Sequence, residues 1–114
     1  MKLDRNIPDN DGRGKYAIIK LRALEDCRSD ETFHTYSPEI ERALKTLQAV
    51  GALDWGENGT ESEFFLIRLK DKYAQPALYA YAEAAVADDA EYANEIVDMA
   101  KRSGRASPWC KRPD

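Results

Sequence analysis

Hydrophobic residues recur every three to four positions between residues 40 and 50 of this 114-residue chain. That spacing places them on one face of a helix. Ser37 suits the N-cap, Pro38 suits the first helical position, and Gly51 suits a left-handed helix end. The pattern therefore predicts a capped central helix over residues 37–51.

Two shorter segments alternate in the way that suits strands. Residues 15–22 are KYAIIKLR and residues 64–70 are FFLIRLK, each with one apolar face and a second face that ends in basic residues. If these strands pair side by side, four basic side chains converge: Lys20, Arg22, Arg68 and Lys70. A short strand is also predicted over residues 52–55, before a turn at residues 57–60. A helix over residues 15–25 remains an alternative, because a short apolar run does not settle the period.

Two alanine-rich segments near the C-terminus, residues 72–87 and 90–103, predict a close-packed helical hairpin. Asp71 is expected to cap the first helix, Asp88 and Asp89 mark the break, and Gly104 ends the second helix. The expected fold is α+β: a small sheet with a capped central helix and a C-terminal helical hairpin. One domain is expected over residues 1–114, with an irregular arm at 1–14 and a basic tail at 105–114.

Residues 37–70 also have the element order of a winged helix: helix, short strand, turn, long strand. Such a fold would place the central helix in the major groove of DNA. Glu39 and Glu41 on that helix, and the acidic turn at residues 57–63, would repel phosphates. The charge therefore argues against DNA reading.

The composition, 43% hydrophobic and 33% charged, is that of a globular chain and not of a disordered one. No apolar run approaches the roughly 18 residues that a membrane span needs, and residues 1–15 lack the apolar centre of a signal peptide. We therefore expect a cytoplasmic protein without membrane partners. Its core is modest for its length, which favours a homo-oligomer.

The net charge is −4, which argues against a dedicated nucleic-acid binder. The charge is unevenly spread, however. Residues 88–100 carry five acidic side chains and no basic ones, whereas the last fourteen residues carry five basic side chains and one acidic one. The distribution therefore matters more than the sum.

The converging basic residues are the main candidate ligand site, because Arg and Lys bind phosphate through charge-assisted hydrogen bonds. Arg13 and Lys15, flanked by Gly12 and Gly14, would add a flexible anion-binding loop. Tyr16 and Tyr79 are candidates for stacking on a base. The competing interpretation is that basic strand ends serve solubility and that tyrosines lie at a core boundary.

No catalytic constellation is found, so no enzyme is expected. His34 is the single histidine, and Cys27 and Cys110 lie too far apart in sequence for a metal or redox motif. We expect free thiols, no metal and no cofactor. The acidic pairs fit turns and caps better than acid–base catalysis.

Three stretches, Gly12–Arg22 (GRGKYAIIKLR), Phe64–Ala74 (FFLIRLKDKYA) and Ser107–Asp114 (SPWCKRPD), resemble small uncharacterised accessory proteins of tailed phages and prophages. The resemblance implies a protein that acts by binding. The function we expect is a sponge that sequesters a phosphate-bearing small molecule, most concretely a nucleotide second messenger of host immunity. The alternatives are an acidic inhibitor that mimics nucleic acid through residues 39–54 and 88–98, and the winged-helix DNA binder.

Overall fold

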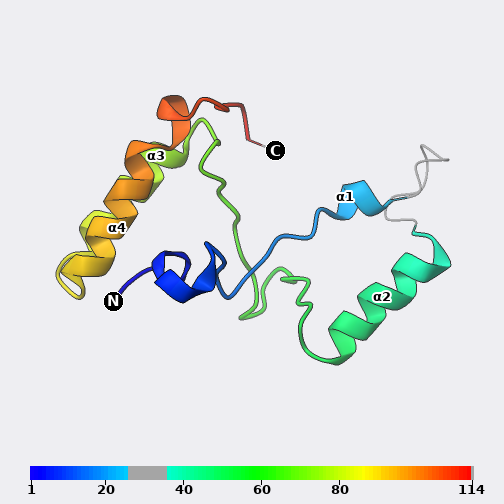
Figure 1. Cartoon of the computed structure of the whole chain (residues 1–114). Helices are drawn as coiled ribbons and strands as arrows, with labels where there is room; N and C mark the ends of the chain where they lie inside the picture. The colour runs from blue at the N-terminus through cyan, green and yellow to red at the C-terminus, as the bar shows by residue number, and fades with distance from the viewer. Residues whose placement is uncertain (26–35, 114) are drawn as a thin grey trace. The chain divides into compact units, whose positions relative to one another are not determined.

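The computed structural model describes residues 1–25 and 36–113, and within these residues all regular structure is helical (Figure 1). The described chain divides into two compact units. The first, called the hairpin unit, combines Met1–Ala17 with Leu66–Asp114, and the second, called the middle unit, is Ile18–Phe65. Whether the whole chain acts as a single domain stays a prediction.

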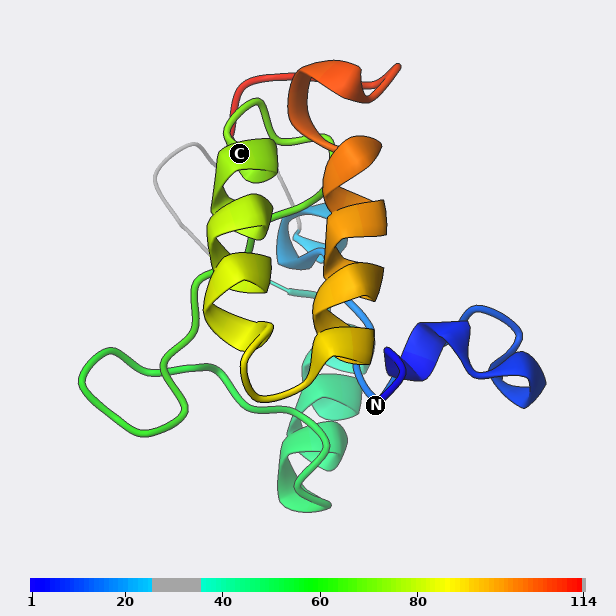
Figure 2. The ribbon, with the colours of Figure 1, turned by 90° about the vertical axis from the view of Figure 1, so that its left-hand side faces the viewer.

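The hairpin unit is built on helices α3 (Ala74–Ala85) and α4 (Ala90–Lys101), which lie side by side (Figure 2). Ile96 and small residues make its core; the buried alanines are Ala74, Ala82, Ala93 and Ala100. Because alanine projects only a methyl group, it lets two helices approach closely, and it forms helix at no cost in side-chain entropy. The predicted helical hairpin is confirmed.

The ends of the hairpin follow from capping chemistry. Asp89 is the N-cap of α4, and its carboxylate accepts the N–H of Tyr92 at 3.0 Å. The prediction that Asp71 caps α3 is wrong. The Asp71 carboxylate accepts the N–H of Tyr73 at 2.7 Å, but Tyr73 precedes the first residue of the helix, Ala74. Helix α4 ends at Lys101 and not at Ser103, whose hydroxyl donates back to the Ala100 carbonyl at 2.7 Å.

The N-terminal arm forms two single 3₁₀ turns, η1 (Asp4–Asn6) and η2 (Pro8–Asn10), and binds the start of α4. The Met1 ammonium lies 2.9 Å from the Asp89 carboxylate, and the Lys2 ammonium lies 3.7 Å from Glu95. The backbone N–H of Leu3 donates to the same Glu95 carboxylate. The arm therefore places two ammonium groups and one backbone N–H against the carboxylates in the first turns of α4. The dipole of α4 stabilises carboxylates at its N-terminus as well.

These contacts shift three pKa values. The hydrogen bond from the Leu3 N–H is the main reason why the pKa of the Glu95 carboxyl lies below its usual range. The Tyr92 N–H, followed by the Met1 ammonium, lowers the pKa of Asp89. The hydrogen bond to Asp89 in turn raises the pKa of the Met1 amine.

The middle unit contains one helical turn, α1 (Leu21–Leu24), and the central helix α2 (Pro38–Ala49). The hydroxyl of Ser37 accepts the N–H of Ile40 at 3.3 Å, and Gly51 adopts a left-handed φ of 79°. The predicted central helix and its cap are confirmed. The predicted turn at residues 57–60 is confirmed too, with the N–H of Thr60 donating to the carbonyl of Glu57 at 3.2 Å.

The predicted sheet is wrong. Neither residues 15–22 nor residues 64–70 form a strand, and residues 52–55 do not either. In the described residues, bridge pairing is limited to two isolated pairs, Glu25 with Tyr36 and Asp71 with Lys111. A strand forms its backbone hydrogen bonds with a neighbouring strand. Alternating apolar residues indicate which side of a strand would be buried, but they do not show that a neighbouring strand exists. The helix alternative for residues 15–25 holds only over α1.

Local contacts explain why the chain after α2 turns. The N–H groups of Ala52 and Leu53 both donate to the Leu47 carbonyl, at 2.9 and 3.1 Å. Gly56 has a φ of 63°, and a Cβ there would lie 2.2 Å from the ring of Phe64. The chain therefore closes on α2, and the wing that a winged-helix protein needs does not form over the described residues 52–70.

The charged contacts of the arm predict a pH window for its docking. The lowered carboxyl pKa values lie below the usual value of about 4, so their stabilisation is present above about pH 4 and is lost as pH falls through the lowered pKa. The raised amine pKa acts in the opposite sense: its contribution is present below about pH 8 and is lost as pH rises through the raised pKa. A titration of the Leu3 methyl resonances by NMR should show two transitions, one at each limit, while Leu78 in α3 stays constant. A Leu3 signal that does not change below pH 6 would contradict the docking.

Candidate functional site

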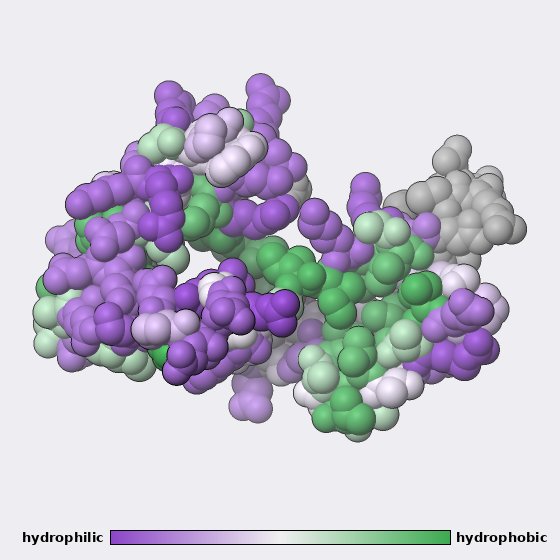
Figure 3. All heavy atoms as spheres, in the orientation of Figure 1, coloured by the Kyte–Doolittle hydropathy of each residue, from purple (hydrophilic) through white to green (hydrophobic). Residues whose placement is uncertain are grey.

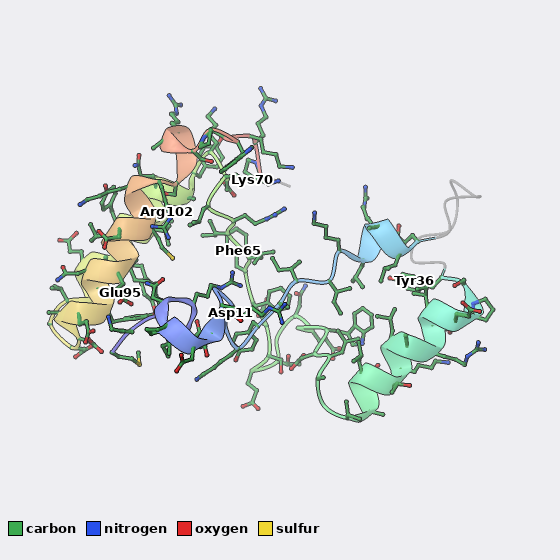
Figure 4. The ribbon with its side chains drawn as sticks, viewed as in Figure 1. Asp11, Tyr36, Phe65, Lys70, Glu95 and Arg102 are labelled. Carbon is green, nitrogen blue, oxygen red and sulfur yellow. The ribbon has the colours of Figure 1, made fainter. Side chains whose placement is uncertain are left out.

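The chain after α4 folds back along the segment that leads into α3. The N–H of Gly104 donates to the Leu69 carbonyl at 2.7 Å, the N–H of Lys111 donates to the Lys70 carbonyl at 3.0 Å, and the N–H of Lys72 donates to the Lys111 carbonyl at 2.9 Å. These bonds hold residues 69–72 beside the short helix η3 (Gly104–Ala106) and the C-terminal segment (Figure 4). Two segments that are remote in sequence thus form one end of the hairpin unit.

This end of the hairpin unit gathers positive charge, and we call it the basic end. Residues 68–72 and 101–112 contain eight basic side chains and one carboxylate, that of Asp71. The basic residues are Arg68, Lys70, Lys72, Lys101, Arg102, Arg105, Lys111 and Arg112. Hydrophilic side chains cover this end of the molecule in Figure 3.

The positive charge of the basic end is only partly neutralised. The Asp71 carboxylate accepts the Tyr73 N–H, and Lys101 lies 3.9 Å from the Asp98 carboxylate. The Arg102 guanidinium donates to the Asp98 carbonyl at 3.2 Å. In residues 1–25 and 36–113, no carboxylate lies within 4.0 Å of four other cationic groups, and none of them has a hydrogen-bond partner there: Arg68, Lys72, Arg105 and Arg112. Cations without a carboxylate or hydrogen-bond partner in the described chain are available to an anionic ligand.

Two aromatic rings accompany these cations. The Lys72 ammonium lies 5.6 Å from the centre of the Tyr73 ring, and the Tyr73 residue is 59% exposed. Trp109 is 75% exposed, although its backbone N–H donates to the hydroxyl of the buried Ser107 at 3.2 Å. The backbone of Trp109 is thus held while its indole faces solvent, which is the arrangement of a stacking surface.

The structure distributes the predicted ligand residues over four places. Arg68 and Lys70 belong to the basic end, whereas Lys20 and Arg22 lie in the middle unit around α1. The strand pairing that would have made the four converge is absent, because neither segment is a strand. Tyr79 lies on α3 and is 41% exposed.

Arg13, Lys15 and Tyr16 lie in the arm. Arg13 and Lys15 line an open hollow of about 290 Å³ together with Asp4, Ile7, Asn10 and Gly14. The backbone N–H of Lys15 was expected to bind an anion in this loop, but it already donates to the Asp4 carboxylate at 2.6 Å. That carboxylate lies 2.8 Å from where a Cβ of residue 14 would stand, so a larger residue there would displace the carboxylate. The predicted anion loop thus binds an anion of its own chain.

The remaining candidates carry less chemistry. Cys27 and His34 lie outside the described residues, and Cys110 is an exposed thiol. Among the residues that the structure describes, no group of three His, Cys, Asp or Glu side chains is placed to hold a metal ion. None of the described helices has the length and apolar character to cross a bilayer.

Sequence reasoning missed six of the eight basic residues of the basic end. Lys72, Lys101, Arg102, Arg105, Lys111 and Arg112 were not assigned to a site. The excess of basic residues in the tail was a signal, but nothing in the local pattern indicated that the tail returns to the start of α3. The left-handed φ of 57° at Gly104 makes that return possible.

Comparison with protein-family models, with characterised proteins and with solved structures gives no match for this chain.

Gly104 should be the most sensitive point of the basic end. In a Gly104→Ala variant the left-handed φ is strained, and the new Cβ would lie 3.2–3.3 Å from Gln75 and from the Lys72 carbonyl. We expect a loss of about 1–3 kcal/mol in the stability of this end. Amide hydrogen exchange at Lys111 should accelerate by about tenfold or more. The matched control, Gly12→Ala, has the same kind of strain with no atom within 4 Å, and it should leave Lys111 exchange unchanged.

Proposed function

We propose that this protein binds a phosphate-bearing nucleotide ligand, without altering it chemically, at the basic end of its helical hairpin. The supporting observation is the set of four cationic side chains without a carboxylate or hydrogen-bond partner in the described chain, together with the exposed indole of Trp109 at the same end. Three of the four are arginines, whose planar guanidinium groups bind two phosphate oxygens at once. An exposed indole adds a stacking surface for a base.

The overall charge of −4 does not oppose this proposal, because the charges are segregated. Asp88, Asp89 and Glu91 lie at the other end of α4, and a helix of 12 residues is about 18 Å long. Asp98 lies nearer to the basic end, and its carboxylate is 3.9 Å from the Lys101 ammonium. The Debye length at physiological ionic strength is about 8 Å. A phosphate near Arg105 therefore experiences mainly the positive charge around it.

The structure favours this proposal over an acidic inhibitor that mimics nucleic acid. Asp89, Glu91 and Glu95 on α4 are engaged by the Met1 ammonium and by Lys2, which reduces the negative charge that they offer a partner. On α2, the Lys45 ammonium lies 3.5 Å from the Glu41 carboxylate. The acidic surfaces are thus partly neutralised within the chain, unlike the basic end.

A role as a sponge for a nucleotide immune messenger in the cytoplasm of a phage-infected host is the most concrete form of this proposal. It depends on the resemblance to phage accessory proteins, together with the basic end. The proposed site differs from the one expected from the sequence, since Arg68 and Lys70 are joined by residues of the tail and not by Lys20 and Arg22.

Nucleotide binding can be tested by thermal shift with ADP and with a cyclic dinucleotide, and with adenosine as the phosphate-free control. A tenfold excess of ligand over Kd stabilises the folded state by about 1.4 kcal/mol, which should raise Tm by about 5 °C or more. Adenosine should give no shift. Arg105→Glu should abolish the shift, whereas Arg42→Glu, the same charge change on α2, should retain it. A ligand-induced shift that survives Arg105→Glu would reject the basic end as the site.

We also propose that the protein associates with a second copy of itself through the middle unit. Leu44 is the buried hydrophobic residue of that unit's described part, whereas Val50, Phe64 and Phe65 are 72%, 65% and 87% exposed. Hydrophobic atoms are visible on this unit's surface in Figure 3. A unit with so small a core gains stability by burying such residues in an interface.

Self-association can be tested by the mass in solution, measured by light scattering. The protein should be a dimer or larger, and Phe65→Glu should yield the monomer, because a carboxylate opposes burial. Ala84→Glu, a substitution at an exposed position of α3, should leave the mass unchanged. A wild-type chain that is monomeric at 100 μM (roughly the range in which weak interfaces form) would contradict the proposal.

A further inference from the structure

We infer that the ligand of the basic end is single-stranded nucleic acid, recognised by its phosphates and by stacking of its bases. This inference depends on the proposed function and names its ligand class. It is carried by two adjacent segments, each of which combines an exposed ring with a cation that has no carboxylate partner among the described residues: Tyr73 with Lys72, and Trp109 with Arg112.

The exposure of these side chains favours a strand over a free nucleotide. Sites for small molecules bury most of the ligand surface, about 70–90%, in a cleft. Arg105, Lys111 and Arg112 are exposed, and Trp109 is 75% exposed. Such residues form a surface along which a longer ligand can lie.

The number of cations points in the same direction. A nucleotide holds its one to three phosphates in a single group, whereas the four cationic side chains without a carboxylate or hydrogen-bond partner among the described residues come from separate positions of the chain, 68, 72, 105 and 112. A strand supplies one phosphate for each nucleotide, so each further cation finds its own partner. Each such contact also releases counterions and strengthens binding at low salt.

The exposed rings favour a single strand over a duplex. In a duplex the faces of the bases are covered by their neighbours, so an indole cannot stack on them. In a single strand every base has an accessible face, and proteins that bind single strands combine such rings with a basic surface. Trp109, with its backbone held by Ser107, is the principal stacking residue in this arrangement.

The experiment measures fluorescence anisotropy of labelled 12-nucleotide oligo(dT) and oligo(U), with a 12-base-pair DNA duplex and polyglutamate as competitors. The full chain should bind the single strands in a salt-dependent way, and neither competitor should displace them at equal concentration. Trp109→Ala should weaken binding about tenfold, whereas Trp55→Ala, the same loss on the middle unit, should not. Arg112→Gln should reduce the slope of log Kd against log salt by about 0.7, the value for one phosphate contact on a single strand. The Tm of each variant identifies any loss of binding that is caused by unfolding.

The outcomes separate this inference from the proposed function. If ADP raises Tm but the oligonucleotides bind no more tightly than ADP, the strand is rejected and the nucleotide site stands. If neither ADP nor any oligonucleotide binds, both are rejected. Equal binding of the duplex or of polyglutamate, unaffected by Trp109→Ala, would also overturn the inference, because it would show charge attraction without recognition of bases.

Discussion

The close packing of α3 against α4 is the contact on which the rest of the hairpin unit depends. Its buried residues are mostly alanines, so the helices approach closely, but each buried methyl group contributes little apolar area. The unit compensates at both ends of the pair. The arm binds the acidic start of α4, and the C-terminal segment bonds to residues 69–72 before α3. Gln75 adds a cross-connection by donating to the Ala100 carbonyl at 3.1 Å.

Both ends of the pair use charge, with opposite results. At the start of α4, carboxylates meet an ammonium group and backbone N–H groups, so their charges are largely satisfied. At the opposite end, the cations gather because the chain returns there, and the Asp71 carboxylate among them is occupied by a backbone N–H. The fold therefore uses one charged end for stability and leaves the charge of the other end largely without partners.

The helices were predictable because their signals are local. Ser37, Pro38 and Gly51 mark the ends of α2, and Asp89 marks the start of α4, through contacts within a few residues. The sheet was not, because strands depend on partners that a local pattern does not identify, and residues 15–22 and 64–70 find none in the described chain.

The candidate site divides in the same way. Arg68 and Lys70 were recognised from their own segment, with a wrong reason for their convergence. Trp109 and Arg112 belong to the site only because Lys111 pairs with residues 70 and 72, and that contact spans about 40 positions of sequence. The role of Asp4 was equally hidden, because its carboxylate reaches the Lys15 N–H from the other side of the arm's turns.

The cations that stay without a carboxylate partner beyond the end of α4 also give the hairpin unit a positive pole. A protein with an isoelectric point near 5.1 is expected to drift away from negatively charged polymers. A dipolar one rotates first, so that its positive pole leads and its negative pole trails in the screened solvent. Encounter with a polyanion is then governed by orientation, and the face that arrives first is the one that carries the indole.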